Sequence, residues 1–424
     1  MLNGFFAVSV VNICGRLLNF ILFFVVANLF GVSVSTDWFF FVYGVAYFFV
    51  SISYYAAESA FVPEWYRLAE DERADFYRFS VKLSFCIVII ACSAMLVGGF
   101  WVAPWRRIHV PDIGMAAVWS VLVLSLQPGL AFLSSLFSSY HQYQRRYILP
   151  TIHISLRSIG VLATLLLLPQ RNILVLSVAF LVGEILRFIC LFPRDLKISL
   201  KSVLRRNSDK VFWDVYRNVL WMTLVLACTV VNPIVDLAMV GSFSPGSVTL
   251  VEYAGKLRGM PVLALVGVLV ILLGEWAQQH NSPSVDFSWK TVARACWLTT
   301  LFCLPFVLIL MLTLNIWVPI VFRPGNFNAS NLQEIERLLW WYLMGIPFLA
   351  LSHVLSRAIL VLRQVRLLAL VSLLAMGVNF LANIFLLKYW GLIGVAIATS
   401  VVDVFVFLCY FLFVRRYMSD VLTS

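Results

Sequence analysis

The sequence contains little charge. Only 12% of its 424 residues are Asp, Glu, Lys or Arg, whereas 62% are hydrophobic and the mean hydropathy is +0.95. Soluble globular domains carry about 25% charged residues, so this composition excludes that class. The chain is therefore predicted to be an integral membrane protein.

Motifs for metal binding and catalysis are missing as well. The eight cysteines lie in or beside apolar segments, with no CxxC pair and no His/Cys cluster at the spacing of metal ligands. They are typical of small core residues, and we expect neither disulfides nor zinc. The sequence has no HExxH, GxSxG or P-loop motif, and the connections expected outside the membrane are too short for a catalytic loop domain. We expect a non-enzymatic protein.

Long apolar segments are what the sequence does have. A membrane-spanning helix needs about 20 such residues, and we predict an all-α integral membrane fold of about 12 transmembrane helices. The first segment follows no basic leader and no small-residue cleavage site, so we expect it to remain in the protein as a helix. The predicted helices are 4–30, 36–61, 81–103, 113–139, 148–168, 172–193, 213–241, 248–275, 291–321, 338–361, 367–387 and 391–414.

The net charge of +11 is explained by topology. Most of the 31 Lys and Arg residues fall in the even-numbered connections between predicted helices, above all in 193–217. Cytoplasmic loops of membrane proteins are enriched in these residues, so both chain termini are predicted to be cytoplasmic. Nucleic acid is not an expected partner.

The basic connection 193–217 divides the predicted helices six and six, which suggests a duplication. A shift of 219 residues places Glu184 on Asp403, and the same shift aligns two polar connections. A duplicated set of six helices gives two pseudo-symmetric lobes, 1–200 and 201–424, around a central cavity, as in transporters with parallel repeats. The alternative is a chance similarity between apolar segments.

Several sequence stretches resemble one family. GRLLNFILFFVVANLFGVSVSTDWFFFVYGVAYFF at 15–49 and AFVP at 60–63 are similar to the opening of the MurJ/MviN-type lipid II flippases. GSVTLVEYAGKLRGMPVLALVGVLV at 246–270, VFRPGNFN at 321–328 and NFLANIFLLKYWGLIGVAIATS at 379–400 resemble later segments of that family, in the same order. The family belongs to the multidrug, oligosaccharidyl-lipid and polysaccharide exporter superfamily.

The resemblance implies a lipid flippase of the bacterial inner membrane. Its substrate would be an undecaprenyl-pyrophosphate-linked saccharide, lipid II or a related cell-wall precursor, moved by alternating access in peptidoglycan biosynthesis. We expect a monomer whose partners are membrane lipids and this substrate. The main alternative is an O-antigen or exopolysaccharide flippase, because Leu22 and the run 47–49 stand where relatives carry further arginines. A cation-coupled drug exporter, a non-transporting scaffold and a membrane-bound polymerase or ligase are more distant alternatives.

Basic side chains within apolar segments are the first candidates for a binding site. At the centre of a membrane helix such a residue costs roughly 2.5 to 3.5 kcal/mol, so it usually faces a polar cavity or a partner. Glu184 is predicted to pair with Arg187 three residues later, a spacing that places both on one helix face. The six residues are Arg16, Arg157, Arg187, Lys256, Arg258 and Arg357.

The resemblance assigns roles to some of these residues. Arg16 and Lys256 match family arginines that face the cavity, where such groups can bind a pyrophosphate through charge-assisted hydrogen bonds. The candidate substrate contacts are Arg16, Lys256, Arg258, Asp37 and Glu58.

Each assignment has a structural alternative. Arg16 would neutralise Asp37 or Glu58, and Lys256 would form an i,i+4 ion pair with Glu252. Asp37 would cap a helix N-terminus.

A second group of polar residues resembles a cation site. Asp236, Asn379, Asn383 and Thr399 match positions that form a sodium site in some of these flippases, and the carbonyl of Val395 is a further candidate ligand. Oxygen ligands with one carboxylate suit a hard cation such as Na⁺, although the family favours an acid at Asn383, so that protons are an alternative. The structural alternative is that the asparagines join helices through hydrogen bonds.

Overall fold

The computed structural model describes residues 2–97, 114–193, 230–263, 288–322, 327–362 and 364–421, together with positions 227, 269, 272, 275, 276 and 279. All regular elements in these ranges are helices. Nine of the described helices contain segments long and apolar enough to cross a membrane, and two shorter apolar helices cover Cys14–Phe30 and Val230–Val240. The chain forms two compact units.

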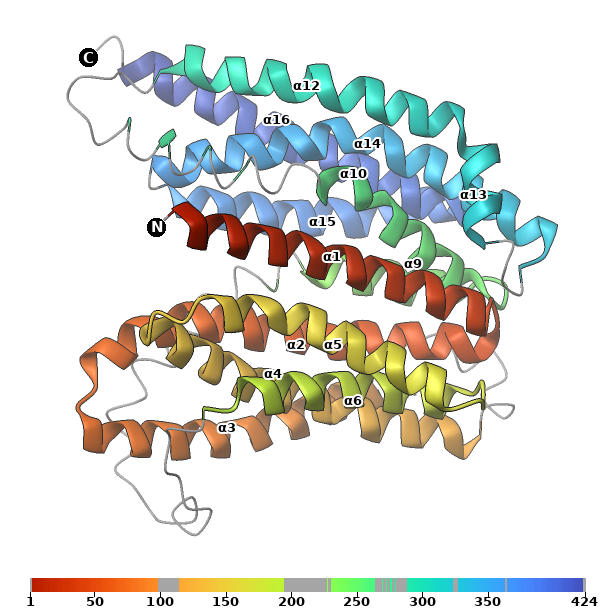
Figure 1. Ribbon diagram of the computed structural model, residues 1–424. Coiled ribbons are helices and arrows are strands. Elements are labelled where there is room, and N and C mark those ends of the chain that lie inside the picture. Colours follow the sequence, from red (N-terminus) through yellow and green to blue (C-terminus); the bar gives the residue numbers. More distant parts are fainter. Residues whose placement is uncertain are drawn as a thin grey trace. The chain divides into compact units, whose positions relative to one another are not determined.

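The first unit comprises Met1–Ile234 and Ser244–Val248. Within it α4 packs against α2, α3 and α6, while α5 packs against α1 and α6 (Figure 1). Its aromatic core includes Phe61, Trp65, Phe76 and Phe132, all at most 2% exposed. Its helices are α1 (Leu2–Phe30), α2 (Val34–Arg67), α3 (Glu70–Val97), α4 (Met115–Tyr143), α5 (Ile148–Leu167) and α6 (Ile173–Leu191).

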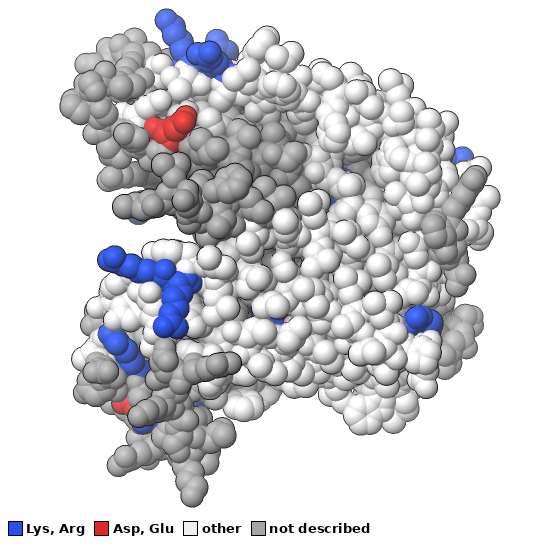
Figure 2. Space-filling model, viewed as in Figure 1, with Lys and Arg blue, Asp and Glu red and all other residues white. Residues whose placement is uncertain are grey.

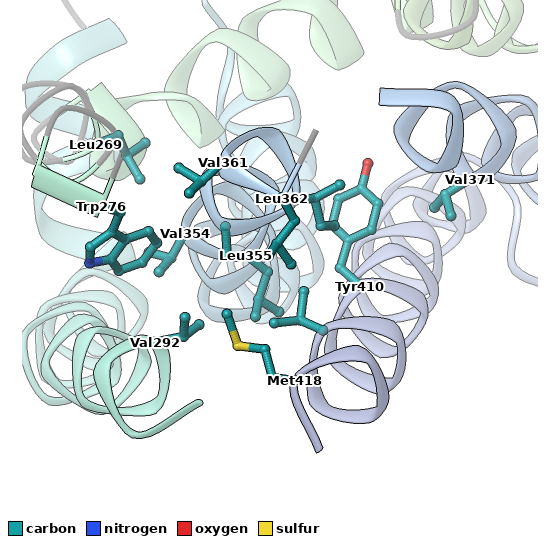
Figure 3. Packing of buried hydrophobic residues seen from close by; sticks show 13 residues of the cluster. Leu269, Trp276, Val292, Val354, Leu355, Val361, Leu362, Val371, Tyr410 and Met418 are labelled. Atoms are coloured by element: carbon teal, nitrogen blue, oxygen red, sulfur yellow. The ribbon is translucent and has the colours of Figure 1, made fainter. Parts of the chain in front are cut away.

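The second unit comprises Val235–Phe243 and Thr249–Ser424. Here α14 is the central helix, in contact with α12, α13, α15 and α16. Figure 3 shows its core, in which Val354 and Leu355 of one helix meet Tyr410 and Met418 of another. α9 (Ser247–Arg258) begins in the first unit and continues into this one. The other helices of this unit are α10 (Met260–Leu263), α12 (Trp289–Leu312), α13 (Leu314–Phe322), α14 (Ala329–Val361), α15 (Val365–Trp390) and α16 (Ile393–Val421).

Two of the predicted helices are interrupted, which corrects the sequence analysis. The predicted helix 248–275 breaks after Arg258, where Gly259 weakens the helix and Pro261, early in α10, lacks the N–H that a continuous helix would use. The predicted helix 291–321 breaks at Thr313, whose hydroxyl donates to the carbonyl of Ile309 at 2.7 Å. Hydropathy alone detects neither break, because both flanking segments are apolar.

Other predicted bounds hold only for the apolar part of a helix. The helix predicted from residue 338 begins at Ala329, because the Asn328 side chain accepts a hydrogen bond from the N–H of Asn331 at 2.8 Å and caps a polar first turn. The predicted lobe boundary between 200 and 201, and much of the predicted helix 213–241, lie outside the described residues. The predicted number of helices is therefore untested.

The described surface is predominantly apolar. Large side chains such as Leu166, Leu167 and Phe302 are 72 to 79% exposed on helices of spanning length. In Figure 2 the coloured basic and acidic side chains lie mostly toward one margin, and the broad face beside them carries few. Exposed apolar area of this extent is what a membrane-embedded surface requires.

Two glycines allow α5 and α6 to approach closely. A Cβ at Gly183 would lie 2.5 Å from the carbonyl oxygen of Arg157, and a Cβ at Gly160 would lie 2.8 Å from the Cα of Gly183. Small residues at such contacts let membrane helices pack backbone to backbone. The contact also brings Arg157 of α5 next to Glu184 of α6, the residue that follows Gly183.

We predict that Gly183→Ala destabilises the protein, because the new methyl group forces α5 and α6 apart at a cost of about 1 to 3 kcal/mol. Gly377→Ala on α15 is the matched control, since a Cβ there meets no atom within 4 Å. Thermal unfolding in detergent should show a lower melting temperature for the first variant and an unchanged or higher one for the second. Equal melting temperatures would contradict the close packing.

Candidate functional site

One buried carboxylate in the first unit holds two arginines. Glu184 on α6 is fully buried, with Oε2 3.3 Å from Nε of Arg157 and Oε1 3.0 Å from Nη1 of Arg187. Arg157 also donates to the hydroxyl of Tyr43 at 2.7 Å. The guanidinium of Arg187 lies over the ring of Tyr54, 3.9 Å from its centroid.

The predicted pair between Glu184 and Arg187 is confirmed. The second arginine on Glu184 was not predicted, because Arg157 lies on another helix and no local spacing connects the two. Two cations share one carboxylate here, so this described cluster carries one positive charge in excess. The Nε and Nη2 atoms of Arg187 have no hydrogen-bond partner among the described residues.

Asp37 lies at the start of α2. Ser33 and Thr36 form the local cap, since the N–H of Ser33 donates to the Thr36 hydroxyl at 2.8 Å and the N–H of Thr36 donates to the Ser33 hydroxyl at 3.2 Å. Asp37 is 1% exposed, and its Oδ2 accepts a hydrogen bond from the N–H of Gly246 at 2.5 Å. The carboxylate therefore binds a backbone group remote in sequence, at the residue that precedes α9, where φ is +95°.

The two strongest substrate candidates lie on helices of different units. Arg16 on α1 is partly buried in the first unit. Lys256 on α9 lies in the second unit, 35% exposed, with Nζ 2.9 Å from Oε1 of Glu252. The i,i+4 ion pair considered from the sequence therefore forms, and substrate contact by either cation stays a prediction. The side chain of Glu58 lies outside the described part of the chain.

The predicted cation ligands come together in the second unit. Asn379 and Asn383, one turn apart on α15, both donate through Nδ2 to Oδ1 of Asp236, at 2.8 and 2.6 Å. Thr399 on α16 interacts with Asp236, and its hydroxyl donates to the carbonyl of Val395 at 2.9 Å. All five residues predicted from the resemblance therefore belong to one buried cluster.

These contacts agree with helix-joining hydrogen bonds, and the cluster also passes a test for a cation. Asn383 is fully buried, and its Oδ1 has no hydrogen-bond partner among the described residues. A buried carbonyl oxygen without a hydrogen-bond partner, next to a buried carboxylate, offers two oxygen atoms that a hard cation could bind. Oxygen donors of this kind suit an alkali cation better than zinc, which prefers nitrogen and sulfur ligands.

A second ion pair lies beside this cluster. Arg258 at the end of α9 pairs through Nη2 with Oδ2 of Asp403 on α16, and its guanidinium lies 5.6 Å from the ring centroid of Tyr342. Gly345 of α14 makes room for the pair, because a Cβ there would collide with Oδ2 of Asp403 and would lie 2.9 Å from the Ser400 hydroxyl. The structure pairs Arg258 with Asp403, and its predicted contact with substrate stays a prediction.

Sequence reasoning missed this pair, although one signal for it was present. The shift of 219 residues had placed Glu184 on Asp403, and both acids turn out to hold a buried arginine from another helix. The shift does not place Arg157 on Arg258. The alignment could therefore indicate that the two acids are equivalent, but it could not identify the arginines that they bind.

The comparison with known protein families decides the classification. The sequence model described as lipid II flippase MurJ matches residues 26–422. The chain belongs to this family. A probable lipid II flippase MurJ of Thermotoga maritima is 24% identical over 299 residues, which cover 70% of this chain and 56% of that protein. The chain thus aligns with little more than half the length of this relative.

Solved structures support the same fold. A lipid II flippase MurJ in an inward closed conformation superposes with a TM-score of 0.84 at 20% identity, over 96% of this chain and 87% of that chain. An inward-facing multidrug resistance MATE family transporter of the MOP superfamily superposes with a TM-score of 0.76 at 12% identity, over 96% of each chain. The predicted MurJ family and the all-α membrane fold class are confirmed.

We predict that Glu184→Gln destabilises this MurJ family member by about 3 to 5 kcal/mol, because it leaves two arginines buried without their countercharge. Asp75→Asn is the matched control. It removes the acid of the more exposed Arg78–Asp75 pair, 2.7 Å apart, which should contribute less than about 1 kcal/mol. Melting temperatures in detergent should fall clearly for the first variant only. A similar small change in both would show that Glu184 does not balance the arginines.

Proposed function

We propose that the protein flips an undecaprenyl-pyrophosphate-linked saccharide, lipid II or a related cell-wall precursor, across the bacterial inner membrane. The observation that carries the proposal is the family match over 26–422, in a chain whose described helices form two units of spanning helices. The protein would transport its substrate by alternating access between the two units. It would act as a monomer, with both chain termini in the cytoplasm. No catalytic step is needed for flipping, and we infer none.

The head group would be recognised by its charge. A pyrophosphate carries at least two negative charges, and Arg16 and Lys256 are the cations that we propose as its ligands. Arginine binds phosphate oxygens through a planar fork of donors, whereas lysine acts as a point charge. The Glu252 carboxylate, 2.9 Å from Lys256, would hold this lysine in place and would compete with the phosphate for it.

Transport would be coupled to a monovalent cation bound at Asp236. The carboxylate would supply the charge, and Asn383, Thr399 and the carbonyl of Val395 would supply further oxygens. Support comes from the orphaned Oδ1 of Asn383 and from the burial of Asp236 at 7% exposure. A bound cation would add the positive charge that the cluster lacks.

An O-antigen or exopolysaccharide repeat-unit flippase is the second candidate function. The observation that favours it is Leu22, which is 1% exposed in the core and stands where the sequence resemblance leads us to expect an arginine. The MATE transporter with the same fold indicates that the fold alone does not select the substrate. The distinction therefore depends on the chemistry of the head group.

We predict that the protein restores outward exposure of the lipid II head group in cells depleted of their own lipid II flippase. The Arg16→Ala, Lys256→Ala double variant should lower the exposure about tenfold or more, since each charge-assisted hydrogen bond contributes about 1.5 to 3 kcal/mol. The readout is labelling of the head group at the outer face of intact cells.

The matched control is Arg337→Ala, Lys388→Ala, which removes one arginine and one lysine with exposed side chains. It should flip at the wild-type rate at equal expression. A double variant of Arg16 and Lys256 with full activity would contradict the proposed head-group contacts. Rescue only of cells that lack an O-antigen flippase would replace the first candidate function with the second.

A further inference from the structure

The pair between Arg258 and Asp403 lies one helical turn from the proposed cation ligands. Thr399 and Asp403 are four residues apart on α16, so their side chains lie on one helix face. Thr399 interacts with Asp236, and Asp403 forms an ion pair with Arg258. Arg258 is close enough to Asp236 for the two to interact electrostatically.

Tyr342 connects the two groups. The guanidinium carbon of Arg258 lies 5.6 Å from the centroid of its ring, and Tyr342 also interacts with Asp236 and Thr399. Asp403 and Asp236 are the acids whose charges act on Arg258 most strongly. The arginine therefore has one bound carboxylate and one alternative carboxylate nearby.

We propose that Asp403 is a positioning residue that keeps Arg258 away from Asp236 and so leaves the Asp236 carboxylate available to a monovalent cation. The inference rests on the proposed cation coupling. A buried arginine without a countercharge is strongly disfavoured, so that an Arg258 released from Asp403 would turn to the remaining acid. Its guanidinium would then act as a tethered cation and occlude the site.

The charge count of the cluster supports this arrangement. Asp236 and Asp403 provide two negative charges and Arg258 one positive charge, which leaves a single negative charge for a monovalent ion. Gly345 adds a steric argument, because any larger residue there would displace Asp403 and Ser400 from α14. The Ser400 hydroxyl donates to the carbonyl of Trp341 at 2.6 Å, which fixes α16 against α14 next to the pair.

The test measures how the melting temperature of the purified full-length protein depends on NaCl, with choline chloride used to keep ionic strength constant. The wild type should be stabilised by Na⁺ and not by choline. Asp403→Asn should need at least tenfold more Na⁺ for the same stabilisation, because Arg258 then binds Asp236. The Arg258→Met, Asp403→Asn double variant should recover the wild-type response, because the occluding charge is gone.

Recovery in the double variant separates positioning from a structural role, since removing a second group would not repair a merely damaged fold. Arg258→Met alone should keep a response to Na⁺. A wild-type response in Asp403→Asn, or no recovery in the double variant, would overturn the proposal. If Na⁺ does not specifically stabilise the wild type, both the positioning role of Asp403 and the cation site are wrong. The proposed lipid flipping is tested separately, by head-group exposure in cells.

Discussion

The constraint on which the structure depends is the cost of a charge in a low-dielectric interior. In each unit, a buried acid is paired with an arginine of another helix. Glu184 of α6 binds an arginine of α5, and Asp403 of α16 binds the arginine that ends α9. Such pairs add little to the free energy of unfolding compared with apolar packing. Removing one partner, however, leaves a buried charge without its countercharge, so the pairs specify which helices must lie together.

The two units differ in the sign of the charge left over. In the described cluster of the first unit, Arg157 and Arg187 outnumber Glu184 by one positive charge. In the second unit, Asp236 and Asp403 outnumber Arg258 by one negative charge. The two described clusters therefore leave charge of opposite sign, which the proposed transport of an anionic lipid with a coupling cation would use.

Much of the fold followed from hydropathy, because the cost of exposing backbone to lipid forces apolar segments into helices. The helix breaks at Gly259 and Thr313 did not follow, since they depend on local hydrogen bonds within apolar sequence. The residues that meet at Asp236 were grouped by the family resemblance, not by spacing, and cation binding by them stays a prediction. The Arg157 and Arg258 partners could not be predicted, because contacts between remote helices leave no local pattern in a single sequence.

The most direct test of the account is flipping in proteoliposomes that carry a fluorescent undecaprenyl-pyrophosphate-linked saccharide, with and without an imposed Na⁺ gradient. A membrane-impermeant quencher reports how fast the labelled head group reaches the outer face. The account predicts protein-dependent flipping that a Na⁺ gradient accelerates, and that loses this acceleration in Asp236→Asn. Flipping no faster than in protein-free vesicles would contradict the account.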